Sequence, residues 1–527
     1  MVFSRYFISA ALILAEFALL IYLTVSASTY SAFALGFSVC MNILAVFSLI
    51  NRDANPEYKV SWLVVVLFVP FFGLVLYYLF YALRGSEKER KLMLNIRRTF
   101  EEANDKLRAE SDEGDGTRVE LNSPITERDA VFSDLKGRNA SAGGKALAIM
   151  GDDPLAEIFV GSFSEYFELG EKMFESMLRD IRKAEKFIFM EYFIIDKGSM
   201  WERIHSLLKE KVKEGVEVRV LYDDIGCMKS LPGDFHRQLS GEGIKCLPFS
   251  PLSPRISGTH NNRDHRKILI VDGLSAYTGG INLADEYINE KKRFGHWKDG
   301  GIRVTGMAVG GFLKLFLSMW DYTSGKPSDP LLYLSQVKGC ENEDGGFYVP
   351  FGSGPLPMYS SPTGKNVLLN LINQAERYLY VTTPYLIIDY DLTQALCNAA
   401  KRGVDVRIIT PGTPDKKTVK LMTKSSYSYL IQHGVRIFEY IPGFIHEKTV
   451  ISDDLYALVG TINFDYRSLA HHFEDAVWIF GCRTVTDIRD GFLKTAAVSD
   501  EKDCEGVRLS FLERLLRNII RVFAPLL

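Results

Sequence analysis

Two short segments of the chain combine residue types that can carry out acid–base chemistry. Both follow the spacing His-x-Lys-x4-Asp. An imidazole exchanges protons near neutral pH, and an ammonium two residues away attracts anions, so the pair suits an anionic substrate. The residues at these positions are His265, Lys267 and Asp272 in the first segment and His446, Lys448 and Asp453 in the second.

The first segment predicts a short buried strand. An apolar run at 268–271 is followed by the turn-forming pair Asp272-Gly273. Side chains two residues apart on a strand share a face, so His265 and Lys267 are expected to point into one space and Arg266 away from it.

The two segments belong to a longer internal repeat. The stretch AEKFIFMEYFIID from residue 184 is answered by AERYLYVTTPYLIID from residue 375, and each motif is followed by Gly-x-x-Asn. One domain fold used twice, related by a pseudo-twofold axis, would bring both motifs to a shared cleft. A phosphate group is the natural occupant, because the lysines and the amides of Asn282 and Asn463 donate hydrogen bonds and phosphate accepts them.

The elements around the motifs predict an α/β fold. Apolar, β-rich runs at 186–195 and 217–226 flank an amphipathic helical pattern at 200–215. This alternation favours two homologous α/β domains with mostly parallel sheets covered by helices.

Composition narrows the function further. A net charge of −3 and a pI near 6.4 argue against general nucleic-acid binding. The seven cysteines form no C-x-x-C pair, which favours reduced thiols over a disulfide framework or a zinc site.

The N-terminal part predicts a membrane anchor. The segments 7–25, 32–50 and 62–83 are each long and apolar enough to cross a bilayer, although Glu16 in the first leaves two or three spans open. Basic residues after the third segment place the following domains in the cytoplasm by the positive-inside rule, at the cell membrane.

These patterns divide the chain into five parts. The last part is an amphipathic helix that either lies on anionic lipid or packs on the core, and the sequence leaves both open. The predicted parts are an anchor at 1–83, a polar linker with short helices at 84–150, α/β domains at 151–335 and 336–505, and the C-terminal helix at 506–527.

The duplicated motif resembles that of the phospholipase D superfamily, and the apolar N-terminus and the EYFIID stretch at 191–196 are similar to its bacterial cardiolipin synthase branch. The resemblance implies a ping-pong reaction through a phosphohistidine on His265, with His446 as the acid. Two lysines supply the positive charge, so no metal or cofactor is expected.

The resemblance also implies a carboxylate behind each histidine to fix its tautomer. By position, Asp299 would serve the first copy and Glu474 the second, with Asp475 as the competing choice. Asp272 and Asp453 are expected to close the turns after their strands. His472 is predicted to be structural, and His260, in a loop before the first motif, is left open as an entrance residue.

The implied activity is synthesis of cardiolipin from two phosphatidylglycerols at a lipid bilayer, with no nucleic-acid partner. A phospholipase D hydrolase, in which water is the acceptor, is the nearest alternative. A nucleic-acid phosphodiesterase and a catalytically inactive scaffold are less favoured, because of the acidic pI and the two intact motifs. The sequence leaves the oligomeric state and the acceptor alcohol open.

Overall fold

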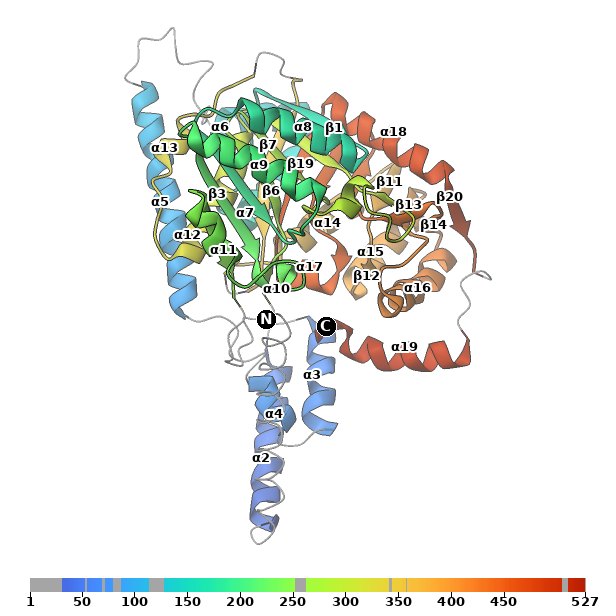
Figure 1. Cartoon of the computed structure of the whole chain (residues 1–527). Coiled ribbons are helices and arrows are strands. Elements are labelled where there is room, and N and C mark those ends of the chain that lie inside the picture. Colours follow the sequence, from blue (N-terminus) through green and yellow to red (C-terminus); the bar gives the residue numbers. More distant parts are fainter. Residues whose placement is uncertain are drawn as a thin grey trace.

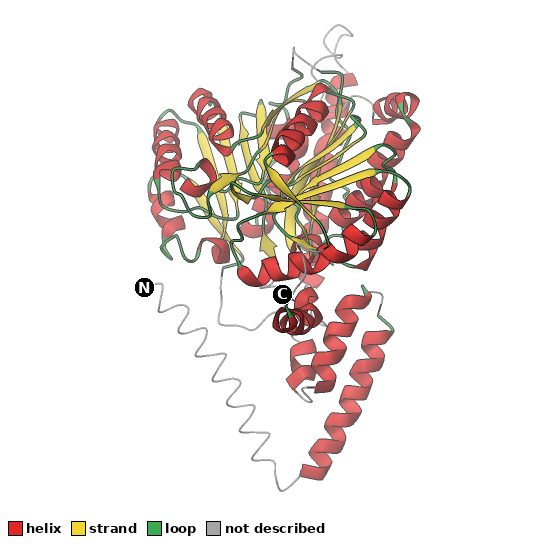
Figure 2. Ribbon diagram, turned by 90° about the vertical axis from the view of Figure 1, so that its right-hand side faces the viewer, coloured by secondary structure: helices red, strands yellow, loops and turns green. Residues whose placement is uncertain are grey.

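The computed structural model describes residues 31–52, 55–68, 72–78, 87–112, 128–251, 262–340, 344–356, 358–504 and 510–526. Two α/β domains form one body, and helices α2 (Ser31–Ile50), α3 (Pro56–Phe68) and α4 (Phe72–Tyr77) extend from one side of it (Figures 1 and 2). The segment 7–25 and the loop with His260 lie outside the described residues.

The first domain is built on a mixed sheet. Its second half, from β2 onward, is parallel, and the other neighbouring pairs are antiparallel. In spatial order the strands are β1 (Ser162–Phe167), β9 (Gly301–Gly306), β7 (Ser275–Gly279), β6 (Lys267–Val271), β2 (Phe187–Tyr192), β3 (Glu217–Asp223) and β4 (Lys245–Phe249).

The second domain repeats this order and direction strand for strand, with one further strand at the edge. The two domains are therefore structural repeats. The corresponding strands are β10 (Phe347–Ser353), β19 (His472–Phe480), β17 (Tyr456–Gly460), β16 (Thr449–Ser452), β11 (Tyr378–Thr382), β13 (Asp405–Pro411) and β14 (Arg436–Tyr440), and β20 (Ser499–Lys502) is the addition.

The expectation of mostly parallel sheets is wrong. Parallel pairing is confined to the stretch where strands alternate with helices, such as β2–α9–β3. The motif strands β6 and β16 are followed by tight turns, and a turn of a few residues can only return the chain as an antiparallel neighbour.

Helices cover both outer faces, and a shared apolar core lies between the two sheets. This core joins Phe189 and Ile302 of the first sheet to Ile409 and Val477 of the second. Helices α12 (Val309–Ser324) and α18 (Arg483–Ala497) contribute to the same core. The remaining longer helices of the domains are α8 (Gly170–Lys183), α9 (Ser199–Lys213), α11 (Phe235–Gly241), α14 (Thr363–Asn373), α15 (Tyr390–Lys401) and α16 (Lys417–Gln432).

The segment 84–150, predicted as a polar linker, holds long helices that pack on the domains. Helix α5 (Glu87–Asp112) buries Met93, Ile96 and Phe100 in the shared core. Helices α6 (Arg128–Arg138) and α7 (Ala140–Asp152) bury apolar residues in the core of the second domain. In α5 a polar composition thus concealed one apolar stripe.

Only part of the segment 62–83, predicted as one membrane helix, lies within the described residues, so that prediction stays a prediction. The described part comprises helix α3 (Pro56–Phe68) and a short helix, α4 (Phe72–Tyr77), which packs back on α3. A Cβ on Gly73 would lie 2.2 Å from the carbonyl oxygen of Val65, so this contact requires glycine. The predicted segment 32–50 is helical, as α2 (Ser31–Ile50).

Among the residues that the structure describes, no helix combines the length and the apolar character needed to cross a membrane.

The two motif aspartates, Asp272 and Asp453, sit in equivalent turns. Each has a positive φ, 54° and 61°. The Asp272 carboxylate accepts hydrogen bonds from three successive backbone N–H groups at 185–187, at the start of β2. The Asp453 carboxylate does the same at 376–378, before and at the start of β11. The contacts tie each motif strand to its neighbour and do not involve the histidines.

We expect Asp453→Ala to lower the free energy of unfolding by about 2–4 kcal/mol, because several buried backbone N–H groups lose a charged acceptor. Denaturant unfolding measures this, and Asp487→Ala, at an exposed position on α18, is the control. An Asp453→Ala protein of unchanged stability that had lost all activity would instead indicate a chemical role.

Candidate active site

The two domains meet through crossed strand pairing at the motifs. Strand β5 (Arg263–Asp264) of the first domain pairs with β19 of the second, and β15 (Gly443–Ile445) of the second pairs with β8 (His296–Lys298) of the first. The backbone N–H of His265 donates to the Phe473 carbonyl at 2.8 Å, and that of His446 donates to the Lys298 carbonyl at 2.8 Å. Each histidine is thus held by the other domain.

The same crossing decides which carboxylate orients which histidine. His265 Nδ1 lies 2.8 Å from Glu474 Oε2, and His446 Nδ1 lies 2.7 Å from Asp299 Oδ2. Asp299 and Glu474 therefore do contact the histidines, but the pairing predicted within each copy is wrong. In each case the carboxylate that reaches the ring is on the residue directly after the paired residues of the opposite domain, 472–473 before Glu474 and 296–298 before Asp299.

Asp475, the competing candidate, binds a hydroxyl group and a backbone N–H group of the first domain. Its Oδ2 accepts from Thr278 Oγ1 at 2.5 Å, and its Oδ1 accepts from the Lys267 backbone N–H at 3.3 Å. Asp475 therefore fixes strands of the opposite domain and does not contact either motif histidine.

Both imidazoles are set up as neutral bases. Burial lowers the pKa of His265 and His446 well below the ordinary value. The charge interaction and hydrogen bond with His265, with His472 nearby, hold the pKa of the Glu474 carboxylate below its usual range, against the effect of burial. A neutral ring that donates from Nδ1 to this carboxylate keeps its Nε2 lone pair for the substrate.

The motif lysines lie under the histidines and are almost fully buried, at 2% and 4% exposure. Lys267 Nζ donates to the His265 carbonyl at 2.7 Å, and Lys448 Nζ donates to the His446 carbonyl and lies 2.9 Å from the Nδ1 of that ring. Burial lowers the pKa of Lys267 to about 8 and that of Lys448 to about 7. An anion beside them would raise both values. Arg266 is fully buried on the other side, where it donates to Leu315 O and Tyr359 Oη, which confirms that it points away.

The two motif asparagines line the same cavity and differ in their hydrogen bonds. Asn282 accepts from Ile194 N–H at 3.0 Å and donates to Tyr287 Oη at 2.6 Å. The Oδ1 atom of Asn463 is buried without a hydrogen-bond partner among the described residues. Both amides are thus close to the histidines, and the Asn463 amide is the less constrained of the two.

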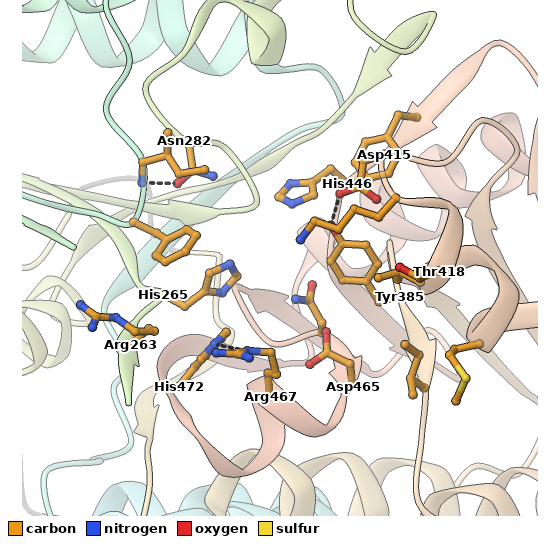
Figure 3. Close-up of a pocket in the computed structure, with 18 of the residues that line it drawn as sticks. Arg263, His265, Asn282, Tyr385, Asp415, Thr418, His446, Asp465, Arg467 and His472 are labelled. Carbon is orange, nitrogen blue, oxygen red and sulfur yellow. Dashed lines mark hydrogen bonds between the residues drawn. The ribbon is translucent and has the colours of Figure 1, made fainter. Parts of the chain in front are cut away.

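The cavity has a volume of about 740 Å³, and both histidines project into it (Figure 3). Its two ends differ. Around His265 lie Arg263, Arg467 and His472, whereas around His446 lie aromatic rings, with Trp297 and Phe444 at ring-centre distances of 5.7 and 5.8 Å. Phe193 also packs on His265, at a ring-centre distance of 5.0 Å, and Lys448 lies against His446. The ends therefore differ in the two arginines and the second histidine near His265 and in the tryptophan and phenylalanine near His446.

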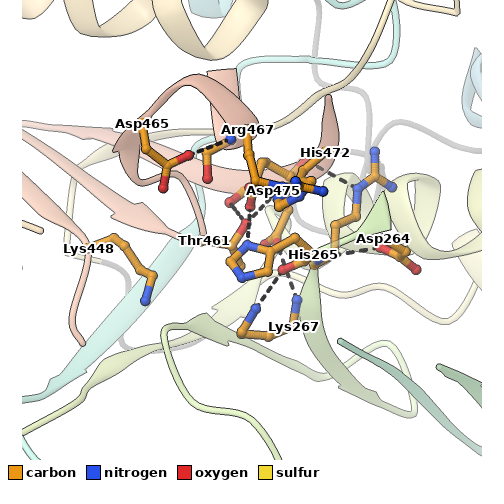
Figure 4. Close-up of polar contacts among 12 residues, drawn as sticks. Asp264, His265, Lys267, Lys448, Thr461, Asp465, Arg467, His472 and Asp475 are labelled. Carbon is orange, nitrogen blue, oxygen red and sulfur yellow. Dashed lines mark hydrogen bonds and ion pairs between the residues drawn. The ribbon is translucent and has the colours of Figure 1, made fainter. Parts of the chain in front are cut away.

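Sequence reasoning missed His472, which the structure places at the site (Figure 4). Its ring centre lies 5.3 Å from that of His265, its Nδ1 lies 3.5 Å from Glu474 Oε1, and its Nε2 accepts from Arg467 Nε at 3.2 Å. When the two repeats are aligned on Asp299 and Glu474, His472 stands at the position of Trp297, two residues before the carboxylate. That alignment would have indicated that the His472 side chain lies beside the site.

Three donor groups, His265, His472 and Glu474, lie within 4.8 Å of one another, a spacing that could hold a metal ion. The surrounding charge does not fit a divalent cation, because Arg467 contacts His472 and Lys267 lies beneath His265. The donor set is better suited to an anionic substrate.

Comparisons with known proteins agree with this geometry. The family model described as "Cardiolipin synthase, PLD-like domain" matches residues 177–292 and 368–495, and "Phospholipase_D-nuclease N-terminal" matches residues 40–80. A protein named cardiolipin synthase from Halalkalibacterium halodurans is 30% identical over 499 residues, which cover 93% of this chain and 94% of that protein. The chain belongs to the cardiolipin synthase family.

An uncharacterised protein from Streptococcus mutans is 45% identical over 368 residues, covering 69% of this chain and 78% of that protein. The crystal structure of phosphatidylserine synthase from Haemophilus influenzae superposes with a TM-score of 0.55 at 14% identity, covering 72% of this chain and 98% of that chain, which supports the fold. As a member of the cardiolipin synthase family, the chain is a phosphatidyltransferase of the phospholipase D type.

The lowered lysine pKa values predict a pH dependence for this family member. The ammonium of Lys448 is present below its pKa of about 7 and is lost as the pH rises through that value. We therefore expect kcat/KM, which reports the free enzyme, to fall above about pH 7. In Lys448→Arg the guanidinium stays protonated, so the fall should move to higher pH even if the rate is lower. Steady-state kinetics across pH, with Lys326→Arg as an exposed control, measures this. If kcat/KM falls at the same pH in Lys448→Arg as in the parent protein, the titration of Lys448 does not cause the fall.

Proposed function

We propose that the protein transfers a phosphatidyl group from one phosphatidylglycerol to another, forming cardiolipin and releasing glycerol, through a phosphohistidine on His265. The proposal rests above all on the crossed arrangement, in which His265 and His446 each bind a carboxylate through Nδ1 and face one cavity. Two bases facing one phosphodiester suit a displacement in two steps.

In the first step, His265 Nε2 attacks the phosphorus, and the bond from phosphorus to the glycerol oxygen breaks. The departing oxygen takes a proton from His446. Burial makes His446 neutral in the free enzyme, so the bound phosphate anion must raise its pKa before it can act as an acid. Lys267 and Lys448, together with the asparagine amides, stabilise the charge on the non-bridging oxygens.

In the second step, neutral His446 accepts the proton of a hydroxyl group on the incoming phosphatidylglycerol. The oxygen of that hydroxyl attacks the phosphorus, and the bond from phosphorus to His265 breaks. One phosphodiester replaces another, so the two steps are chemically equivalent and the overall free-energy change is small.

The unlike ends of the cavity support His265 as the nucleophile. Arg467, together with Arg263, which is ion-paired with Asp223, lies at the end of the cavity with His265, so a phosphoryl group held there has guanidinium groups close by. The rings of Trp297 and Phe444 beside His446 can pack against an alcohol, which carries no charge. The sequence motifs are nearly equivalent, so only this difference in surroundings separates the two roles.

We place the substrate in a lipid bilayer at the cell membrane, with the domains on the cytoplasmic side. The support is the apolar N-terminal sequence and the exposed apolar side chains of α2, among them Phe37, Leu44 and Phe47. Confinement to a surface raises the effective concentration of a lipid acceptor relative to water.

The decisive experiment is product analysis of the full-length protein in vesicles that contain only phosphatidylglycerol. We expect cardiolipin and free glycerol in equal amounts, with phosphatidic acid as a minor product, and we expect added glycerol to drive the reaction backward. His265→Ala and His446→Ala should each lower the rate by at least about a thousandfold, since the two act together. Phosphatidic acid as the main product, with no effect of glycerol, would establish the hydrolase instead.

A second experiment tests the roles of the two histidines. With a phosphatidyl ester of p-nitrophenol, the leaving group departs without an acid, so His446→Asn should accumulate an acid-labile adduct on His265. Mass spectrometry of the quenched protein locates it, and His265→Asn is the matched control, in which no adduct is expected. An adduct on His446 in that control would reverse the assignment.

A further inference from the structure

The C-terminal helix α19 (Phe511–Phe523) presents its apolar side chains to the outside. It begins with a capping box formed by Ser510 and Glu513. Its five exposed apolar side chains are each at least 46% exposed, with Phe511 at 76% and Leu512 at 72%. A surface helix normally buries such a stripe against the core. The five residues are Phe511, Leu512, Leu515, Leu516 and Ile519.

The polar residues of α19 form a separate stripe of positive charge. Arg514, Arg517 and Arg521 recur at intervals of three and four residues. A helix with a wide apolar face beside arginines is suited to the boundary between acyl chains and anionic head groups. An apolar groove on a partner protein could cover the apolar face, but it would give no reason for the row of arginines beside that face.

Helix α19 also borders the active-site cavity. Ile520 and Ala524, near its C-terminal end, line that cavity together with the catalytic histidines. The Pro525 carbonyl lies 3.4 Å from His471 Nε2, and the Tyr58 hydroxyl of α3 lies 3.3 Å from the same atom. The end of α19 and α3 therefore meet at the His471 ring, on the residue that precedes His472 in the chain.

The position of α19 in the fold fits a surface-bound helix. It contacts α3 and α16 and runs along the side of the body from which α2, α3 and α4 extend, crosswise to α2 (Figures 1 and 2). The exposed apolar face of α19 is thus close to the N-terminal apolar helices.

We propose that α19 lies in the head-group region of an anionic bilayer and forms the bilayer-facing rim of the cavity. A lipid could then keep its acyl chains in the bilayer while its phosphate passes Ile520 and reaches His265. The role of the rim rests on the proposed function, whereas the contact of α19 with the bilayer does not.

Fluorescence quenching tests the contact without requiring turnover. Full-length Leu512→Trp protein is placed, one copy per nanodisc, in phosphatidylglycerol with or without brominated acyl chains. We expect the added tryptophan emission, relative to the parent protein, to be quenched by the brominated lipid. The control is Leu332→Trp, at a 62% exposed position on α13 (Leu331–Leu334), where no such quenching is expected. Equal quenching at both positions, or none at 512, would overturn the proposal. Quenching at 512 only when a disc holds two copies would assign the face to a second chain.

Turnover tests the rim. The Leu512→Ser/Leu516→Ser double variant should lose at least about tenfold in turnover of bilayer phosphatidylglycerol, and less than about twofold with a monomeric short-chain substrate. Leu332→Ser should behave as the parent protein in both assays. Equal losses on both substrates would refute the rim. Absence of cardiolipin with the parent protein would refute the proposed function but leave the quenching result valid.

Discussion

The active site depends on the crossed pairing of short strands between the two domains. Residues 263–264 pair with the strand that carries Glu474, and residues 443–445 pair with the strand that ends just before Asp299. Backbone hydrogen bonds fix both the position of each histidine and the identity of its carboxylate. Neither domain contains a complete histidine–carboxylate pair, so the chemistry requires the domains to be docked.

This docking also explains why costly charges are tolerated at the centre of the molecule. Lys267 and Lys448 are buried close to acidic groups of both domains, and burial still lowers their pKa values. Buried ammonium groups contribute little to stability, because the free energy needed to remove them from water exceeds their attraction to the neighbouring carboxylates. Two buried ammonium groups side by side suit an anion, and in the proposed reaction part of the binding energy of the phosphate would offset the cost of burying them.

The sequence predicted the repeat, the motif residues and several elements closely, because these depend on local patterns. The strand predicted at 217–226 is observed as Glu217–Asp223, and the helix predicted at 200–215 as Ser199–Lys213. The crossed carboxylates were beyond such reasoning, since the spacing along one copy says nothing about which copy a side chain faces. The mixed sheets were missed because the βα alternation near β2 and β3 was extended to strands joined by tight turns. His472 was missed because residues were compared by type and not by their position relative to the carboxylates.

The mismatch of His472 with Trp297 has an evolutionary meaning. In a symmetric homodimer of a single such domain, every position occurs identically on both sides of the axis. A substitution that favoured one histidine as nucleophile would then alter the other histidine in the same way. Joining the two copies in one polypeptide removes that restriction, so each half can specialise independently. The arginine and histidine on one side and the tryptophan and phenylalanine on the other are differences that a symmetric homodimer could not carry and a fused duplication can.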